Sequence, residues 1–336
     1  MRLEIARQPQ ALRDLVAAYA RGDGFSALDS LPPRAPVITG MGASLHAAQI
    51  CAAHMLSLGL PAVAVEAAEL LYYGRALLAD RPLVFVSQSG TSPEVAPLLA
   101  LLPPEHPVLA VTNSPESPLA RGATALLPIG AAPEQGVATR TYLNTLALLW
   151  LLARAWAGGR RADDADTLAR IADRCEALVA GAAAAEERWM QALGSVGTLL
   201  FLGHGPHAAT ARQAAMMLAE RARVGAIGTS VGALRHGPVE IVEPGVGAVV
   251  FAAPGPSYES ACALAAELGG HGARVLLVEY GRSRAPDEAP LPGEPADEFL
   301  APILDVIPAQ IFADALARSR GIAAEFRYLG KGERQV

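Results

Sequence analysis

Lysine is almost missing from this sequence of 336 residues. Of its 27 basic residues, 26 are arginine and one, Lys331, is lysine. Chemistry that needs a primary side-chain amine therefore has a single candidate. A run of five or more basic residues is also missing, and the formal net charge is −6. Together these features argue against a nucleic-acid binder.

Long apolar runs and paired cysteines are missing too. The longest apolar run, residues 146–153, is far shorter than the ~20 residues that cross a bilayer. The start, MRLEIARQPQALRDL, is charged throughout, unlike the apolar core of a signal peptide. Cys51, Cys175 and Cys262 are odd in number and widely spaced, and no histidines follow an HExxH pattern. We expect a reduced cytoplasmic protein with no membrane segment, no metal and no other cofactor.

Three pairs of segments repeat along the chain. Gly40 and Gly42, in a turn after an apolar run, match Gly203 and Gly205 at an offset of 163 residues. The apolar runs at 83–87 and 108–112 recur at 248–252 and 275–279, at offsets of 165 and 167. Such short, continuous apolar runs are typical of parallel strands covered on both faces. The repeat predicts an α/β fold with two doubly wound parallel sheets flanked by helices, flavodoxin- or Rossmann-like.

The expected organisation has five parts. These are an N-terminal helical segment at 1–35, a first α/β unit at 36–160, linking helices at 161–194, a second unit at 195–325 and a C-terminal tail at 326–336. The stretch from 281 to 295, rich in Pro, Asp and Glu, predicts an exposed loop.

The segment SQSGTSP, from Ser87 to Pro93, follows an apolar run and precedes a predicted helix that begins at Glu94. In open parallel sheets, ligands bind at the carboxyl ends of the strands. A helix N-terminus there offers unpaired N–H groups, and the serine hydroxyls add neutral donors. We interpret the segment as a phosphate-binding turn. The alternative is a serine-rich helix cap without a ligand.

The glycine turn Gly40-Met-Gly-Ala-Ser44 is less specific. It lacks the third glycine of the dinucleotide fingerprint, although Glu66 follows about 24 positions after Gly42. NAD binding is therefore an alternative at this turn. Ser44 is either a second phosphate ligand or an ordinary N-cap.

A carboxylate and an imidazole follow in the second half of the chain. A predicted helix over 208–221 places Gln213, Met217 and Glu220 on one face, at positions i, i+4 and i+7. His236 precedes a Gly-Pro pair. Taken singly, they fit a solvated helix-end carboxylate and a loop histidine. Taken together, they supply the pair that proton transfer on a sugar needs.

These motifs resemble those of the sugar isomerase (SIS) domain proteins, specifically the isomerase part of glutamine–fructose-6-phosphate aminotransferase and its single-chain deaminase and deglycase relatives. The resemblance covers residues 36–336. It is carried by SQSGTSPEV at Ser87, Glu-Gln-Gly-Val-Ala at Glu134, the pair Glu220 and His236 in AER…LRHGP, and the ending Tyr328-Leu-Gly-Lys-Gly. It implies two tandem SIS units.

The resemblance implies a role for each motif. The residues that resemble phosphate ligands are Ser44, Ser87, Gln88, Ser89 and Ser92, and those that resemble substrate-lining positions are Gly42, Val137 and Gly330. Glu220 resembles the base that moves a proton between C1 and C2. His236 resembles the ring-opening acid–base that a neighbouring subunit of a homodimer supplies. Lys331 resembles the lysine that forms a Schiff base with the open-chain sugar, on a tail over the site; a frayed terminal lysine is the alternative.

The sequence also departs from the family's pattern. The resemblance begins near residue 36 and no cysteine follows Met1, so glutamine is not an expected nitrogen source without a partner subunit. Gln213 and Met217 stand where the family has Glu and Lys, and Arg140 stands in place of another Lys. The substrate class is therefore easier to predict than the reaction.

From this resemblance we expect a phosphosugar isomerase or deaminase that acts on an amino-sugar or ketose/aldose 6-phosphate, such as glucosamine 6-phosphate. The expected partners are a small sugar phosphate and a second copy of the chain in a homodimer. A deglycase of phosphorylated sugar–amine adducts is the close alternative. A non-catalytic phosphosugar sensor is the alternative from another class.

Overall fold

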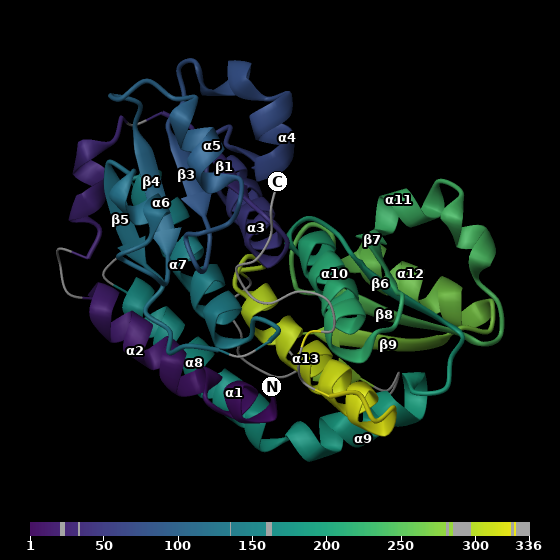
Figure 1. The fold of residues 1–336 in the computed structure, drawn as a ribbon. Helices are drawn as coiled ribbons and strands as arrows, with labels where there is room; N and C mark the ends of the chain where they lie inside the picture. Colours follow the sequence, from purple (N-terminus) through teal and green to yellow (C-terminus); the bar gives the residue numbers. More distant parts are fainter. Residues whose placement is uncertain are drawn as a thin grey trace. The chain divides into compact units, whose positions relative to one another are not determined.

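The computed structural model describes residues 1–20, 24–32, 34–134, 136–158, 163–279, 282–284, 297–323 and 326. They form two compact units (Figure 1). The first unit spans Arg7–Ala172, and the second combines Met1–Ala6 with the described residues from 173 to 323. Each unit holds a mainly parallel sheet flanked by helices, which confirms the predicted fold class.

Five parallel strands form the sheet of the first unit within its described residues, in the order β2-β1-β3-β4-β5. Their bounds are β1 Val37–Gly40, β2 Val63–Glu66, β3 Leu83–Val86, β4 Val108–Thr112 and β5 Ala125–Pro128. β1, β3 and β4 are buried along their whole length, as their continuous apolar runs predict. The strand order is the flavodoxin-like one, with its switch point between β1 and β3.

Helices cover both faces of this first sheet. On one face, α3 (Ala43–Ser57) packs against α7 (Arg140–Trp156). On the other, Leu83 and Phe85 of β3 join a core with Leu70 of α4 and Leu98 of α5. The described part of the unit also contains α2 Gln8–Ala20, η1 Ser26–Ser30, α4 Ala67–Tyr72, η2 Arg75–Leu78, α5 Val95–Ala100 and α6 Pro118–Arg121.

The second unit repeats this strand order in its described residues, as β10-β9-β8-β6-β7. The bounds are β6 Thr198–Gly203, β7 Ile227–Ser230, β8 Val246–Ala252, β9 Arg274–Glu279 and β10 Arg282–Arg284. Numbered within the unit from β6, this is again the order 2-1-3-4-5. The sequence repeat is thus a repeat of strand order.

One expectation for the second unit is wrong. The stretch 281–295 was expected to be a loop, but residues 282–284 form β10, antiparallel to β9. The open edge of β9 presents backbone N–H and C=O groups that a passing segment satisfies, whatever its side chains.

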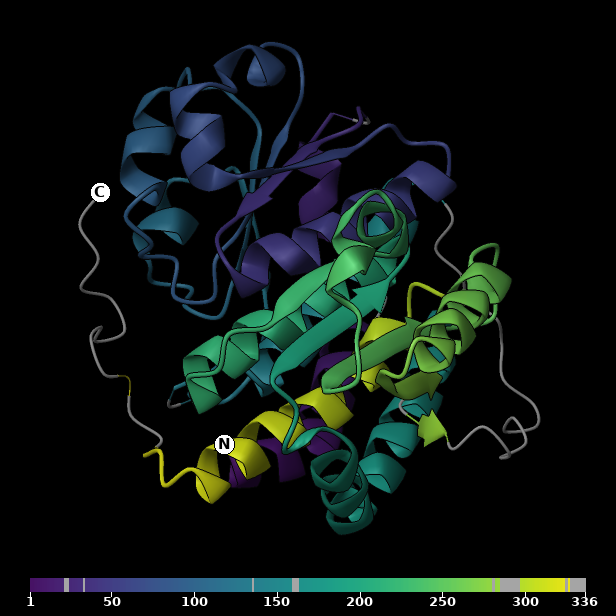
Figure 2. The ribbon, with the colours of Figure 1, turned by 90° about the vertical axis from the view of Figure 1, so that its right-hand side faces the viewer.

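Helices also cover both faces of the second sheet. On one face, α10 (Pro206–Met217) lies beside α13 (Ala301–Ser319), as Figures 1 and 2 show. On the other, Leu234 and Leu264 pack on Leu200 and Val250. The remaining described elements are α1 Arg2–Ala6, α8 Asp164–Ala180, α9 Ala182–Leu193, η3 Leu218–Ala222, α11 Val231–Arg235, η4 Pro238–Ile241 and α12 Tyr258–Gly270. Across the described parts of both units, no helix is long and apolar enough to cross a membrane.

Candidate functional site

The first sheet brings the two predicted phosphate segments to its switch point. The turn Gly40–Ser44 leaves β1, and Ser87 leaves the neighbouring strand β3. A Cβ atom on Gly40 would lie 2.7 Å from the Val86 carbonyl oxygen and 2.8 Å from the Ser44 Cβ. Glycine at position 40 therefore lets the start of α3 lie against the end of β3.

Ser44 does not serve as an N-cap. The N-cap of α3 is Gly42, with φ 52°, and Ser44 is the second residue of the helix, half-buried in its first turn. Its backbone N–H is bonded to the Met41 carbonyl at 3.0 Å. The capping alternative is thus wrong, which leaves the prediction that Ser44 is a phosphate ligand.

The serine turn after β3 holds its hydroxyls through bonds inside the turn. The Oγ atoms of Ser87 and Ser92 lie 3.0 Å apart, and Ser87 Oγ accepts the Gly90 N–H at 3.1 Å. Ser89 Oγ accepts the Thr91 N–H at 3.3 Å. Gly90 has a φ of +63°, which glycine adopts without cost. The result is a turn whose neutral hydroxyl groups are held in place by its own hydrogen bonds.

The helix after this turn is short. It was predicted to begin at Glu94, and α5 spans six residues, Val95–Ala100, with Glu94 as its N-cap and no capping side chain. The serines therefore do not cap it, and its short dipole adds little to anion binding. Gln88 joins the turn to β4, because its backbone carbonyl accepts hydrogen bonds from Thr112 Oγ1 and the Asn113 N–H.

Glu134 organises the segment that holds Val137, the predicted substrate-lining position. Its carboxylate accepts the backbone N–H groups of Thr139, Arg140 and Thr141, and both threonine hydroxyls. These amides begin α7, so the carboxylate caps that helix from outside it. Val137 is buried beside it in the chain. This capping role was not anticipated from the sequence, where Glu134 counted only as part of a motif.

Replacing Glu134 with alanine is expected to lower the free energy of unfolding by about 3 kcal/mol, since three amides of the α7 start lose their acceptor. Urea unfolding of the variant measures this. The matched control is Glu116→Ala, at an exposed glutamate in the same unit. Equal stabilities for the two variants would contradict the capping role.

Glu220 lies in a segment whose backbone differs from the prediction. The α-helix was expected to continue to Arg221, but α10 ends at Met217 and a π-helical turn, η3, follows at Leu218–Ala222. The count of seven residues from Gln213 to Glu220 therefore does not place them on one α-helical face. Gln213 and Met217 are fully buried, whereas Glu220 is half-buried. Single π-turns are frequent at functional sites, where they redirect a side chain.

The other predicted catalytic residues lie in different settings. His236 follows α11 directly and is exposed. Its neighbour Arg235 forms an ion pair with Glu267 at 2.7 Å. Lys331 and Gly330 lie outside the described residues.

The switch point of the second sheet repeats the backbone but not the serines. His207, at the position that matches Ser44, is fully buried and 3.1 Å from Asp305. His204 Nε2 lies 3.0 Å from Ser260 Oγ, and burial, then Arg235, lowers the pKa of His204. The chain after β8 reads Ala-Pro-Gly-Pro instead of Ser-Gln-Ser-Gly. Of the two repeats, only the first carries the serine turn.

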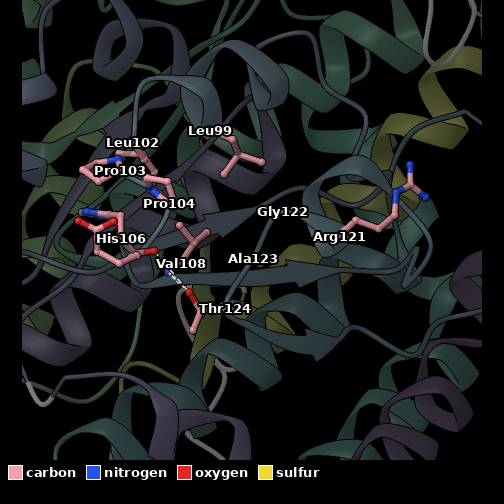
Figure 3. A pocket seen from close by; sticks show the side chains of 11 residues that line it. Leu99, Leu102, Pro103, Pro104, His106, Val108, Arg121, Gly122, Ala123 and Thr124 are labelled. Carbon is pink, nitrogen blue, oxygen red and sulfur yellow. Dashed lines mark hydrogen bonds between the residues drawn. The ribbon is translucent and has the colours of Figure 1, made fainter.

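A separate pocket of about 460 Å³ lies at the amino ends of strands in the first sheet, opposite the carboxyl ends where the serine turn lies (Figure 3). It adjoins Val108 and Thr124, at the amino ends of β4 and β5, and Figure 3 shows the Arg121 side chain pointing away from His106. Burial lowers the pKa of His106. The pocket is thus distinct from the serine turn. No group of three His, Cys, Asp or Glu side chains suited to a metal ion occurs among the described residues.

Comparison with known proteins agrees with this arrangement. Residues 34–155 match the SIS domain family. Over 340 residues, which cover 96% of this chain, the sequence is 29% identical to a glutamine–fructose-6-phosphate aminotransferase (isomerizing) from Zymomonas mobilis subsp. mobilis. The alignment covers 56% of that protein, so the chain spans about half the length of the curated relatives it matches.

Solved structures share the fold. The C-terminal domain of glucosamine-fructose-6-phosphate aminotransferase from Francisella tularensis has a TM-score of 0.83 and 20% identity, and the match covers 96% of both chains. Glucosamine-6-phosphate deaminase from Thermotoga maritima has a TM-score of 0.77 and 21% identity, and covers 98% of this chain and 97% of that one. At these identities the likeness shows the fold alone.

Proposed function

We propose that this chain, which carries a SIS domain at residues 34–155, is an isomerase or deaminase of a hexose 6-phosphate, with glucosamine 6-phosphate as the leading substrate. The serine turn at the switch point of the first sheet is the observation that supports this most. Its hydroxyls bond to one another and to turn amides rather than capping a helix. Such neutral donors suit a phosphate dianion at the carboxyl ends of strands.

The proposed binding mode uses five side chains of the first unit. They are Ser44, Ser87, Gln88, Ser89 and Ser92, with Gly42 and Val137 lining the sugar. The carboxylate of Glu134 supports this arrangement, because it holds the start of α7 next to Val137 in the chain.

The proposed chemistry is a proton transfer between C1 and C2. His236, supplied by the second copy of a homodimer, opens the sugar ring as acid and base. Glu220 then removes the C2 proton and returns it to C1. For a 2-amino sugar this gives an imine at C2, which water hydrolyses to a ketose phosphate and ammonia. By resemblance, Lys331 is the proposed amine for a Schiff base with the open-chain sugar, and Gly330 lines the sugar beside it.

We place the enzyme in the cytoplasm, because its three cysteines are free thiols. Two of them, Cys51 and Cys175, are buried, and burial raises the pKa of the Cys51 thiol. We therefore assign Cys51 and Cys175 to packing and give them no part in the proposed reaction.

A substrate panel tests the proposal. The purified protein is mixed with glucosamine 6-phosphate, fructose 6-phosphate, glucose 6-phosphate, a fructosamine 6-phosphate adduct and unphosphorylated glucosamine. Ammonia release, isomer formation and thermal shift are read in parallel. A ligand at 100 times its Kd adds about 2.7 kcal/mol of stability. Turnover of glucosamine 6-phosphate but not glucosamine is expected. Cleavage of the adduct alone would make the protein a deglycase, and binding without turnover would make it a sensor.

A further inference from the structure

Arg221, the residue after Glu220, is buried and makes four hydrogen bonds within the second unit. Its Nε and Nη2 donate to Asp314 Oδ1 on α13 at 3.0 and 2.8 Å. Its Nη1 donates to the carbonyls of Ile322 and Ala323, just beyond the end of α13, at 3.2 and 3.3 Å. One guanidinium thus ties the π-turn to a helix and to the backbone that follows that helix.

The turn that Arg221 holds has an unfavourable backbone. It is π-helical over Leu218–Ala222, and Arg223 after it has a φ of +54° and a ψ of 41°, the left-handed region that side chains with a Cβ seldom adopt. The Val224 N–H closes the turn on the Leu218 carbonyl at 3.2 Å. Such conformations persist only where the surroundings hold them in place.

We propose that Arg221 is a positioning residue: its planar, multidentate anchor to Asp314 and to the Ile322 and Ala323 carbonyls keeps the π-turn in the geometry that presents the Glu220 carboxylate to substrate. This inference rests on the proposed function, in which Glu220 is the base. Lysine cannot replace arginine here, because a single ammonium cannot span the carboxylate and two carbonyls as the guanidinium fork does.

Arg318 provides a matched control on the same carboxylate. Its Nε donates to Asp314 Oδ2 at 3.3 Å, and its Nη2 pairs with Glu186 at 2.7 Å. Its side chain is 42% exposed, against 7% for Arg221. Arg318 lies on α13, not on the π-turn, and it bonds to the other oxygen of Asp314. Replacing Arg318 therefore leaves the hydrogen bonds of Arg221 to Asp314 in place.

The test compares Arg221→Lys with Arg318→Lys in the full chain. With glucosamine 6-phosphate, kcat of Arg221→Lys is expected to fall about 10- to 100-fold, because displacing a reacting group by about 1 Å costs that much. KM is expected to stay within about threefold, since the phosphate site lies in the other unit. Arg318→Lys is expected to keep kcat within about twofold. Equal kcat values for the two variants would overturn the proposal.

Hydrogen exchange separates this proposal from the function it rests on. Amides of residues 218–224 are expected to exchange at least about tenfold faster in Arg221→Lys than in wild type or Arg318→Lys, and circular dichroism confirms that each variant is folded. If wild type turns over no sugar phosphate, the proposed function fails while this readout still tests the anchor. Unchanged exchange in Arg221→Lys would overturn the anchor itself.

Discussion

Glu220→Gln is expected to lower kcat for C1–C2 proton transfer by about 10²- to 10⁴-fold, the range that a positioned general base contributes. Glutamine keeps the size and polarity of the side chain but cannot take up the C2 proton. Glu220 lies on the π-turn η3 of the second unit, whereas the serine turn follows β3 of the first unit. The substitution therefore leaves the proposed phosphate ligands unchanged, and substrate binding is expected to survive. The variant should still show the stabilisation of about 2.7 kcal/mol at 100 times Kd.

Ammonia release under saturating glucosamine 6-phosphate measures kcat, and a thermal shift measures the stabilisation by the bound ligand. Glu187→Gln is the control, because Glu187 is an exposed glutamate on α9 of the same unit. Its kcat is expected to match wild type. A Glu220→Gln protein that keeps a tenth or more of wild-type kcat would remove Glu220 from the role of base.

The fold was predictable because strand burial leaves a direct trace in the sequence. The runs that became β3, β4, β8 and β9 are continuous and apolar, and their repeat along the chain predicted two doubly wound sheets. The edge strand β10, which pairs with β9, left no such trace, because strand pairing uses backbone N–H and C=O groups that almost every residue carries. Its sequence, Arg-Ser-Arg, is polar and lies in a Pro- and Asp-rich stretch.

Of the candidate site, the serine turn was the easiest part to predict, because its side chains are consecutive in the sequence. The serine turn is one heptapeptide, so its hydroxyls were visible before the fold was known. The π-turn was not, because the α-helical count from Gln213 assumes an even rotation per residue and one changed turn breaks it. Glu134 was missed as a cap for a related reason. The usual N-cap lies directly before its helix, whereas this carboxylate belongs to a residue six positions before Arg140.

Gly90→Ala is expected to destabilise the first unit by about 2–5 kcal/mol and to weaken sugar-phosphate binding at least tenfold. The left-handed φ of +63° costs an alanine about 1–2 kcal/mol. An added Cβ would also lie 2.1 Å from Ser117 Oγ and 2.5 Å from Ser117 Cβ. Ser117 cannot simply rotate away, since its Oγ accepts the Ala120 N–H as the N-cap of α6.

Gly90 is bonded both to a proposed phosphate ligand and to α6, so the clash with Ser117 is expected to displace the serine turn. The Gly90 N–H donates to Ser87 Oγ, and the Gly90 carbonyl accepts the Leu119 N–H at 3.2 Å. Gly130→Ala separates the two contributions, because Gly130 has a φ of +66° and open space where the Cβ would stand. It should lose only the backbone cost of about 1–2 kcal/mol and keep its Kd for glucosamine 6-phosphate. Urea unfolding and calorimetric titration of both variants measure this. Identical losses of stability and unchanged Kd values would show that the added Cβ does not clash with Ser117 and that Gly90 does not shape the proposed phosphate site.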